Sequence, residues 1–294
     1  MLTEDVLSYP STILGDSQRN YYFENGCVRI ERLISDDWLK RLRLANEEMI
    51  DKSRSLNESN DAFILEAGHC ADTPRLKRLT SPVSHHPDFW EFASNSVVID
   101  AVADVVGPNV RFYHSKLNYK WAGGGQCFDW HQDIQAWPHT NYSPVTVGLL
   151  LEDTTIDQGP LTAVRRSHEG ELYDLYDKND EFVIRIEEGK LDWITEDMKE
   201  YMTGPAGTAF LLNCRTIHGS AVNNSLRSRP LLLNVYSSAD AFPYGAQPIP
   251  SDFDGAIVRG EAARWSHHDP RPCQIPPDWS EGYMGPWTHQ KKGV

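Results

Sequence analysis

Six short β-type segments in the second half of the chain constrain the fold more than any other feature of the sequence. They lie between Val110 and Ser238, turns containing Gly, Asn or Pro separate them, and they read VRFYHSKLNYKW, CFDWHQD, VTVGLLLED, PLTAV, TAFLLN and LLLNVYSS. Many short strands of this kind are typical of antiparallel barrels and jelly rolls. We therefore expect a mainly β fold with flanking helices.

The N-terminal part predicts one strand and two helices. Residues 21–34 alternate well enough to suggest a strand, and Ser35 can cap the helix that follows. A second helix is expected over about 87–106, ending at Gly107-Pro108. We expect both helices to pack on the outside of a sheet.

We interpret residues 1–294 as a single domain. Its expected parts are a helical and β N-terminal part (1–108), a jelly-roll core (109–240) with an acidic insertion (169–203), and an irregular tail (241–294) packed over the domain. The insertion is predicted to be partly helical. It is either a solvated surface excursion or a lid over an active site.

Charge and cysteine content narrow the possible partners. The formal net charge of −14 disfavours binding to nucleic acid or to an anionic membrane surface, so a small molecule is the expected partner. The five cysteines are odd in number and form no CxxC pair, which indicates reduced thiols. No apolar run approaches the length of a membrane span, and we expect a soluble cytoplasmic protein. The sequence does not indicate an oligomeric state.

A histidine and a carboxylate stand two residues apart in the run FDWHQD at 128–133. Residues i and i+2 of a strand point to the same side, so His131 and Asp133 could converge on one metal ion. A third ligand would complete a facial set with three open positions, which is typical of non-haem Fe(II) oxygenases. Alone, the motif is weak, because a structural histidine beside a surface aspartate gives the same pattern.

The segment 208–238 offers the third ligand and an arginine. Its two apolar runs flank Asn223-Asn224, which predicts a hairpin. If the hairpin is centred there, His218 faces Arg229 directly across the ladder. An arginine beside a metal ligand suits the distal carboxylate of 2-oxoglutarate, which needs a charged, bidentate donor. The alternative is a surface arginine beside a turn.

Together these residues resemble the phytanoyl-CoA dioxygenase family, and within it the ectoine and proline hydroxylase type. The resemblance covers roughly residues 20–245 and rests on His131-x-Asp133, on His218 with Arg229 eleven residues later, and on the stretch GPLTAVRRSHEG. That stretch is similar to the family's glycine-leucine-x-x-x-x-x-serine-histidine signature. The resemblance implies a double-stranded β-helix (a cupin-like jelly roll). It also implies His131, Asp133 and His218 as Fe(II) ligands and catalytic residues, with 2-oxoglutarate and O2 as co-substrates.

The resemblance also implies contacts beyond the metal. Five residues match contacts to 2-oxoglutarate in the family: Arg229, Ser220, Phe128, Asn118 and Lys120. A solvated lysine is the alternative for Lys120. Trp137 matches an aromatic that contacts the substrate, although it could equally belong to the core. Where the family commonly has isoleucine-proline-glycine before the signature's serine, this chain has Val-Arg-Arg at 164–166, so the role of His168 stays open.

These expectations predict a non-haem Fe(II)- and 2-oxoglutarate-dependent dioxygenase that hydroxylates an unactivated C–H bond of a small molecule, with formation of succinate and CO2. Halogenating relatives replace the carboxylate ligand by Gly or Ala, so Asp133 argues against that chemistry. The alternatives are a catalytically inactive protein or a non-oxidative, cupin-like metal-binding protein, which O2 consumption and succinate release would distinguish. The aromatic residues near the first ligand predict an apolar or amphipathic substrate, bound beneath the insertion and against Trp137.

Overall fold

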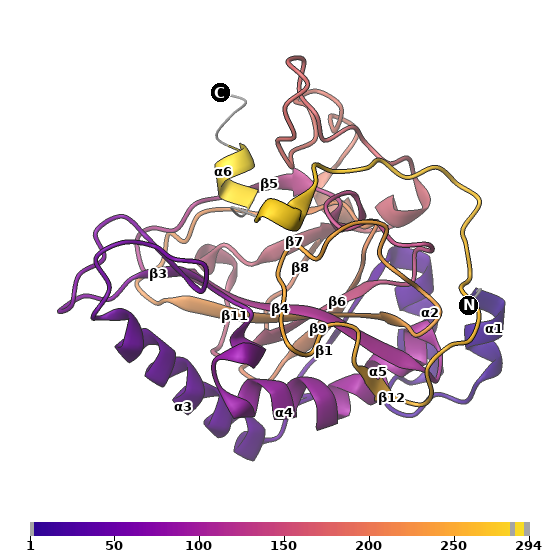
Figure 1. Ribbon diagram of the computed structural model, residues 1–294, viewed down its shortest axis with the longest axis horizontal. Helices are drawn as coiled ribbons and strands as arrows, with labels where there is room; N and C mark the ends of the chain where they lie inside the picture. The colour runs from indigo at the N-terminus through magenta and orange to yellow at the C-terminus, as the bar shows by residue number, and fades with distance from the viewer. Residues whose placement is uncertain (1–2, 283–285, 291–294) are drawn as a thin grey trace.

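All six predicted β-type segments form strands of two antiparallel sheets in the computed structural model, which describes residues 3–282 and 286–290 (Figure 1). In spatial order the larger sheet comprises β1 (Cys27–Ile30), β9 (Ala209–Asn213), β6 (Val145–Leu150), β11 (Arg229–Ser238), β4 (Val110–Lys120), β3 (Leu76–Thr80) and β2 (Phe63–Leu65), with β12 (Ile257–Arg259) also paired to β4. The smaller sheet comprises β5 (Phe128–His131), β10 (His218–Ser220), β7 (Leu161–Val164) and β8 (Lys199–Tyr201). The N-terminal part thus contributes three strands, and the tail one, to the larger sheet.

The two sheets face each other, as the jelly-roll expectation requires. Buried side chains from both sheets and from the segment after β8 form one apolar cluster between them: Cys27, Leu150, Ala163, Met202, Phe210, Leu212, Leu231 and Leu233. Alternation along each strand supplies these inward residues. The architecture is therefore a jelly roll, and the expected fold class is confirmed.

Helices cover the outer face of the larger sheet (Figure 1). As predicted, Ser35 caps α3 (Asp36–Ser53), because its side chain accepts a hydrogen bond from the Trp38 amide at 3.3 Å. The single helix expected over 87–106 is two helices, α4 (Pro87–Asn95) and α5 (Val97–Val106), because the backbone is extended at Ser96 (φ −90°, ψ 167°). Gly107 ends α5 with a φ of 98°. The described part of the chain contains no helix with the length and apolar character of a membrane span.

The expected strand over 21–34 is only partly correct. Its first residues belong to α2 (Asp16–Asn25), which follows the short α1 (Thr3–Ser8), and only β1 is extended. The buried residues of α2 are Arg19, Tyr22 and Asn25, spaced by three as on a helix face. Gly26, with a φ of 75°, ends α2 and lets the chain turn into β1.

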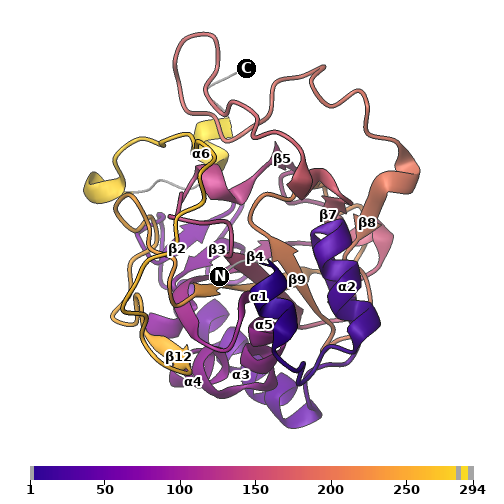
Figure 2. The same ribbon diagram turned by 90° about the vertical axis from the view of Figure 1, so that its right-hand side faces the viewer.

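The insertion at 169–203 contains no α-helix, contrary to the prediction. Besides β8 it has short 3-10 turns, η4 (Ser167–Glu169) at its start and η5 (Glu196–Met198) near its end. Its apolar residues pack on the outer face of the smaller sheet in one buried cluster that includes Val164, Leu175, Phe182, Ile184, Ile186, Ile217 and Trp279. Figure 2 shows the insertion on one side of the sheets and α3 and α4 on the other. The apolar residues of the insertion are therefore packed on the sheet, while stretches such as 178–181 and 187–190 are exposed to solvent.

The tail is mostly irregular, as expected, but it also contains regular elements. Beyond β12 these are η6 (Trp279–Glu281) and α6 (Pro286–Gln290), which lies near β5 (Figure 1). Three further 3-10 turns connect elements of the core, namely η1 (Pro82–Ser84), η2 (Asp133–Gln135) and η3 (Ile156–Gln158).

Gly159 lets the β6–β7 connection approach the chain that follows β10. Its φ is 61°, and a Cβ atom there would lie 2.3 Å from the Ala221 carbonyl oxygen and 2.6 Å from that of Val222. Neither backbone oxygen can move away as the end of a flexible side chain would. The Gly159 carbonyl in turn accepts a hydrogen bond from Arg229 Nη2 at 2.9 Å. Glycine is therefore required both for the conformation and for the close approach.

We predict that Gly159→Ala lowers the free energy of unfolding by clearly more than the strain of a positive φ, which costs about 1–2 kcal/mol. Gly189→Ala is the matched control, because Gly189 has a φ of 86° and nothing within 4 Å of an added Cβ. Chemical denaturation of both variants measures the difference. Equal losses in the two variants would show that the approach of Gly159 to Ala221 is not tight.

Candidate active site

Two histidines form a cross-strand pair in the smaller sheet. His131 ends β5, His218 begins β10, and the two residues are direct partners in the antiparallel register. Directly opposed residues of such a pair point to the same face, and the two ring centroids are 4.1 Å apart. Both side chains are nearly buried and face the larger sheet across a cavity.

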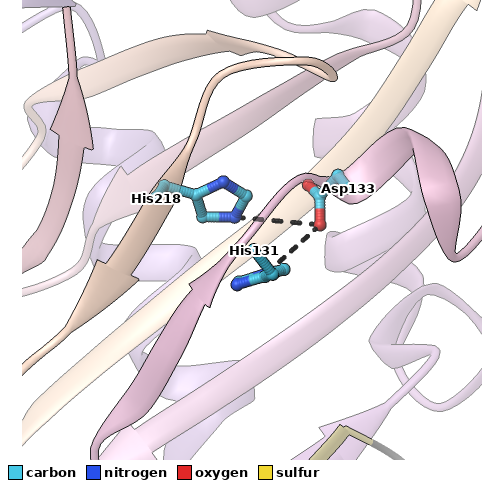
Figure 3. Close-up of side chains that lie close together, drawn as sticks. All are labelled: His131, Asp133 and His218. Atoms are coloured by element: carbon cyan, nitrogen blue, oxygen red, sulfur yellow. Dashed lines mark ion pairs between the residues drawn. The ribbon is translucent and has the colours of Figure 1, made fainter. Parts of the chain in front are cut away.

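Asp133 completes the cluster from outside the strand. It is the first residue of η2, so its carboxylate reaches the histidines through a turn and not through the i, i+2 alternation that we predicted. Its Oδ1 lies 3.6 Å from His131 Nε2 and 3.8 Å from His218 Nε2 (Figure 3). One candidate ligand atom from each residue lies within 4.8 Å of the others. The three residues can therefore hold one metal ion.

Hydrogen bonds orient all three side chains. His131 Nδ1 donates to the Asp129 carbonyl at 2.8 Å, and His218 Nδ1 donates to the Thr216 carbonyl at 2.9 Å. A ring nitrogen that faces a carbonyl oxygen must carry the proton, which leaves the Nε2 lone pair free for a metal. The Thr146 hydroxyl donates to Asp133 Oδ2 at 3.0 Å and leaves Oδ1 toward the histidines. Two imidazoles and a carboxylate on one face of an ion are the donor set that suits Fe(II).

The electrostatics of the cluster also suit a metal. Burial lowers the pKa of His218 to about 4, and the neighbouring His131 adds to this shift. Burial alone would raise the pKa of Asp133, but His218, Lys116 and His131 outweigh it and hold that pKa well below its ordinary value. At neutral pH the site therefore presents a carboxylate and a neutral His218 imidazole, the protonation states that metal ligation needs.

A cavity of about 430 Å³ opens beside the cluster, between the two sheets. Besides the three candidate ligands, it is lined by all five residues that the sequence analysis assigned to 2-oxoglutarate: Phe128, Asn118, Lys120, Ser220 and Arg229. The ring centroids of Phe128 and His131 are 4.5 Å apart, and Ser220 pairs with Phe128 across β5 and β10. Eight of the nine predicted site residues thus meet in one cavity.

Arg229 and Lys120 form a buried pair of cations at one end of the cavity. They are direct cross-strand partners on β11 and β4, and Arg229 is only 3% exposed. Arg229 Nη2 donates to Gly159, while its Nε has no hydrogen-bond partner in the described part of the chain. Lys120 Nζ donates to Ser220 Oγ at 2.7 Å and to the Ala221 carbonyl.

Burial and the charge of Arg229 lower the pKa of Lys120 to about 6. Facing cations in a buried site are unfavourable unless an anion binds between them, so this end fits a carboxylate.

The predicted hairpin between His218 and Arg229 is wrong. β10 pairs with β5 and β7 in the smaller sheet, whereas β11 pairs with β4 and β6 in the larger one. The turn at Asn223 is real, but it carries the chain from one sheet to the other. The Asn223 amide donates to the Lys120 carbonyl at 3.0 Å and to the Arg227 carbonyl at 2.7 Å, which fixes this crossing. Arg229 therefore reaches the cavity from the wall opposite His218.

Trp137 does not line this cavity. It is 4% exposed and packs edge-on against His114, with ring centroids 5.7 Å apart. It borders a separate pocket of about 270 Å³ that Trp279 also lines. No residue of 169–203, a range that the structure describes completely, lines the cavity of the metal cluster either. The expectation of a substrate between the insertion and Trp137 is therefore not supported by the geometry.

His168 lies outside the cavity as well. Its Nε2 is 3.0 Å from the Phe23 carbonyl, and its ring packs beside Gly26. This histidine of the signature stretch thus ties α2 to the η4 turn.

Several residues that line the cavity were not singled out from the sequence. Lys116 shares the inward face of β4 with Asn118 and Lys120, so the alternation of that strand could have identified it. Arg78 lies opposite Asn118 on β3, and its Nε donates to Asn118 Oδ1 at 2.9 Å. Trp287 of α6 also lines the cavity, and Arg78 lies 4.6 Å from its ring centroid. No local pattern in the tail indicates that α6 reaches this place.

Comparisons with known proteins agree with this geometry. A sequence model of the Phytanoyl-CoA dioxygenase (PhyH) family matches residues 22–231. A probable alpha-ketoglutarate-dependent hypophosphite dioxygenase of Stutzerimonas stutzeri is 27% identical over 261 residues, covering 88% of this chain and 91% of that protein. L-proline trans-4-hydroxylase of Streptomyces griseoviridis is 26% identical over 255 residues, covering 79% and 89%. The crystal structure of EctD from S. alaskensis with 2-oxoglutarate and 5-hydroxyectoine shares the fold, with a TM-score of 0.67, 20% identity, and coverage of 89% and 92%.

The hydrogen bond from Thr146 generates a prediction for metal affinity. Thr146→Val keeps the shape of the side chain but removes the donor to Asp133, and loss of such a supporting contact typically weakens metal binding about 10–100-fold. Anaerobic calorimetric titration with Fe(II) measures the effect. Thr162→Val is the control, since the hydroxyl of Thr162, a buried threonine of β7, donates to the Pro160 carbonyl and not to a candidate ligand. If both variants bind Fe(II) like the wild type, Thr146 does not support the ligand.

Proposed function

Because the chain belongs to the phytanoyl-CoA dioxygenase family, we propose that it is an Fe(II)- and 2-oxoglutarate-dependent dioxygenase in which His131, Asp133 and His218 hold the iron. The observation that carries the proposal is the presence of two complementary sites in one cavity. A two-histidine, one-carboxylate cluster lies on one sheet, and a buried cation pair, Arg229 and Lys120, lies on the other.

The chain's residues divide the binding of 2-oxoglutarate between the two walls. Arg229 offers its unpaired Nε to the distal carboxylate, and Lys120 and Ser220 add donors beside it. Phe128 packs against His131 and closes the apolar side of this end. When bound, Fe(II) and 2-oxoglutarate together supply the oxidising chemistry: 2-oxoglutarate and O2 yield succinate and CO2, and one oxygen atom passes to the substrate. The protein's part is to orient the reactants and to exclude water between two packed sheets.

The substrate is a small molecule, and hydroxylation of an unactivated C–H bond is the proposed outcome. The relatives named above act on hypophosphite and on L-proline, both small compounds. The cavity of about 430 Å³ must also hold 2-oxoglutarate, which leaves room for a reactant of similar size.

Iron binding and turnover test the proposal directly. The purified protein is expected to bind Fe(II) and to release succinate with consumption of O2, slowly without substrate. His131→Ala, Asp133→Ala and His218→Ala should each abolish both properties without unfolding the chain, because two ligands leave the metal underdetermined. Metal analysis, an oxygen electrode and succinate detection provide the readouts. Iron binding without any O2 uptake or succinate release would identify a non-oxidative metal protein instead.

A second variant, Arg229→Lys, tests whether Arg229 binds 2-oxoglutarate. A point charge cannot reproduce the planar fork of arginine, so the Michaelis constant for 2-oxoglutarate should rise several-fold while Fe(II) binding persists. Arg227→Lys, at an exposed arginine two residues away, is the control. An unchanged dependence on 2-oxoglutarate in Arg229→Lys would place the carboxylate anchor elsewhere.

The lowered pKa of Lys120 predicts the pH dependence of co-substrate binding. In the free protein this pKa is about 6, so the amine is largely neutral at higher pH. A bound dianion raises the pKa, and binding then takes up a proton. The affinity for 2-oxoglutarate is therefore greatest below about pH 6. It falls as the pH rises above about 6, by at most about tenfold per pH unit. Calorimetric titrations across this range should show the fall in wild type and a flat profile in Lys120→Gln. A flat profile in wild type would show that Lys120 stays charged without the ligand.

A further inference from the structure

Lys116 is a cation of the cavity that lies apart from the cation pair. It shares the inward face of β4 with Asn118 and Lys120, and all three line the cavity. Four residues of extended strand separate Lys116 from Lys120, which is roughly 13 Å. A carboxylate held by Lys120 and Arg229 therefore does not reach Lys116.

The Lys116 ammonium forms no hydrogen bond or ion pair with the part of the chain that the structure describes. Lys120, by contrast, is held by Ser220 and Ala221. Burial lowers the pKa of Lys116 to about 8, and Asp133 opposes this shift while Arg78 adds to it. The side chain is thus a half-buried positive charge near the metal cluster. An unpaired charge in such a place costs free energy that a bound anion would offset.

His114 extends the same inward face of β4 by one more step. It is 1% exposed, and the Gln247 side chain is its hydrogen-bonding neighbour. Burial, with a contribution from Lys116, holds its pKa well below the ordinary value, so the ring is neutral and can donate one hydrogen bond. His114 therefore continues the polar face of β4 beyond Lys116 without lining the cavity itself.

The net charge of the cavity also favours the binding of an anionic group. With 2-oxoglutarate bound, which restores the charge of Lys120, five cationic side chains line the cavity (Lys77, Arg78, Lys116, Lys120 and Arg229), against the two carboxylates Glu66 and Asp133. The charges of Fe(II) and 2-oxoglutarate cancel one another, so the loaded site keeps its positive excess. A neutral or cationic substrate would leave this excess unbalanced.

We propose that Lys116 binds an anionic group of the substrate, a carboxylate or a phosphorus oxyanion, and so holds the reacting bond beside the metal centre. This assignment rests on the proposed function and names its substrate class. It replaces the expectation of an apolar or amphipathic substrate, which depended on Trp137 and on the insertion. Lys116 acts here as a specificity-determining residue, because it contacts a part of the substrate that does not react.

Binding to the loaded but oxygen-free protein tests the proposal. Wild-type protein is saturated with Fe(II) and 2-oxoglutarate under nitrogen and titrated with propionate, with methylphosphonate, and with neutral propanamide. Calorimetry and the visible charge-transfer absorption of the iron complex report binding without turnover. The carboxylate and the phosphonate distinguish the two sources of the anionic group. Lys116→Gln removes the charge, Lys116→Arg keeps it, and Lys77→Gln removes a different charge from the same cavity.

We expect at least one anion, and not propanamide, to bind the wild-type complex. Lys116→Gln should weaken that binding by about tenfold or more, Lys116→Arg should retain most of it, and Lys77→Gln should have the smaller effect. Equal effects of Lys77→Gln and Lys116→Gln, or no anion binding to the loaded wild type, would overturn the assignment. So would a loss of 2-oxoglutarate affinity in Lys116→Gln as large as in Arg229→Lys, which would make Lys116 part of the co-substrate anchor. Failure of the wild type to bind Fe(II) or 2-oxoglutarate at all would instead overturn the proposed function.

Discussion

The register between β5 and β10 is the constraint on which the rest of the site depends. It sets His131 opposite His218 and, after a shift in register between His218 and Ser220, it sets Ser220 opposite Phe128. A slip of one residue would turn one histidine toward the insertion and the other toward the cavity, because the side-chain period of a strand is two. The metal end and one wall of the co-substrate end are therefore fixed by a single short pairing. Hydrogen bonds from β10 to β7 hold that pairing from the other side.

β4 serves the core and the site with opposite faces. Its outward residues Leu117 and Tyr119 pack under the helices, and the Tyr119 hydroxyl donates to Asn46 of α3 at 2.7 Å. Its inward residues Lys116 and Lys120 bring positive charge into the space between the sheets. Burying cations costs stability, whereas burying large apolar side chains stabilises the fold. The apolar packing on the outward face of β4 thus offsets the free energy that is lost by burying cations on its inward face.

The sequence predicted which residues line the site better than it predicted how the chain brings them together. Asp133 is a ligand candidate as expected, yet it reaches the cluster through a 3-10 turn, because the strand ends at His131. Arg229 lines the cavity as expected, yet it comes from the opposite sheet. A turn that returns a strand to its neighbour and a turn that crosses between sheets contain the same Asn- and Ser-rich residues, so local sequence does not separate them. Only the pairing of β11 with β4 decides between the two.

Long-range packing explains the features that the sequence left open or did not indicate. A tryptophan such as Trp137 suits a core and a binding pocket equally well, and only its neighbours His114 and Tyr113 show which it occupies. Within the insertion, Phe182, Ile184 and Ile186 are spaced by two like residues of a strand, yet they belong to no named strand and pack in the cluster on the outer face of the smaller sheet. Trp287 lies far along the chain from every strand of the cavity. Its place depends on the path of the tail, which no short motif describes.

The ring of each metal-binding histidine is steered by the backbone of its own strand. In both cases Nδ1 bonds the carbonyl two residues earlier, at Asp129 or Thr216, and no other side chain takes part in that contact. The walls of the cavity can therefore exchange one side chain for another without disturbing the aim of the imidazoles. A single substitution in the wall of the cavity can thus change what the cavity binds while both of these backbone hydrogen bonds stay in place.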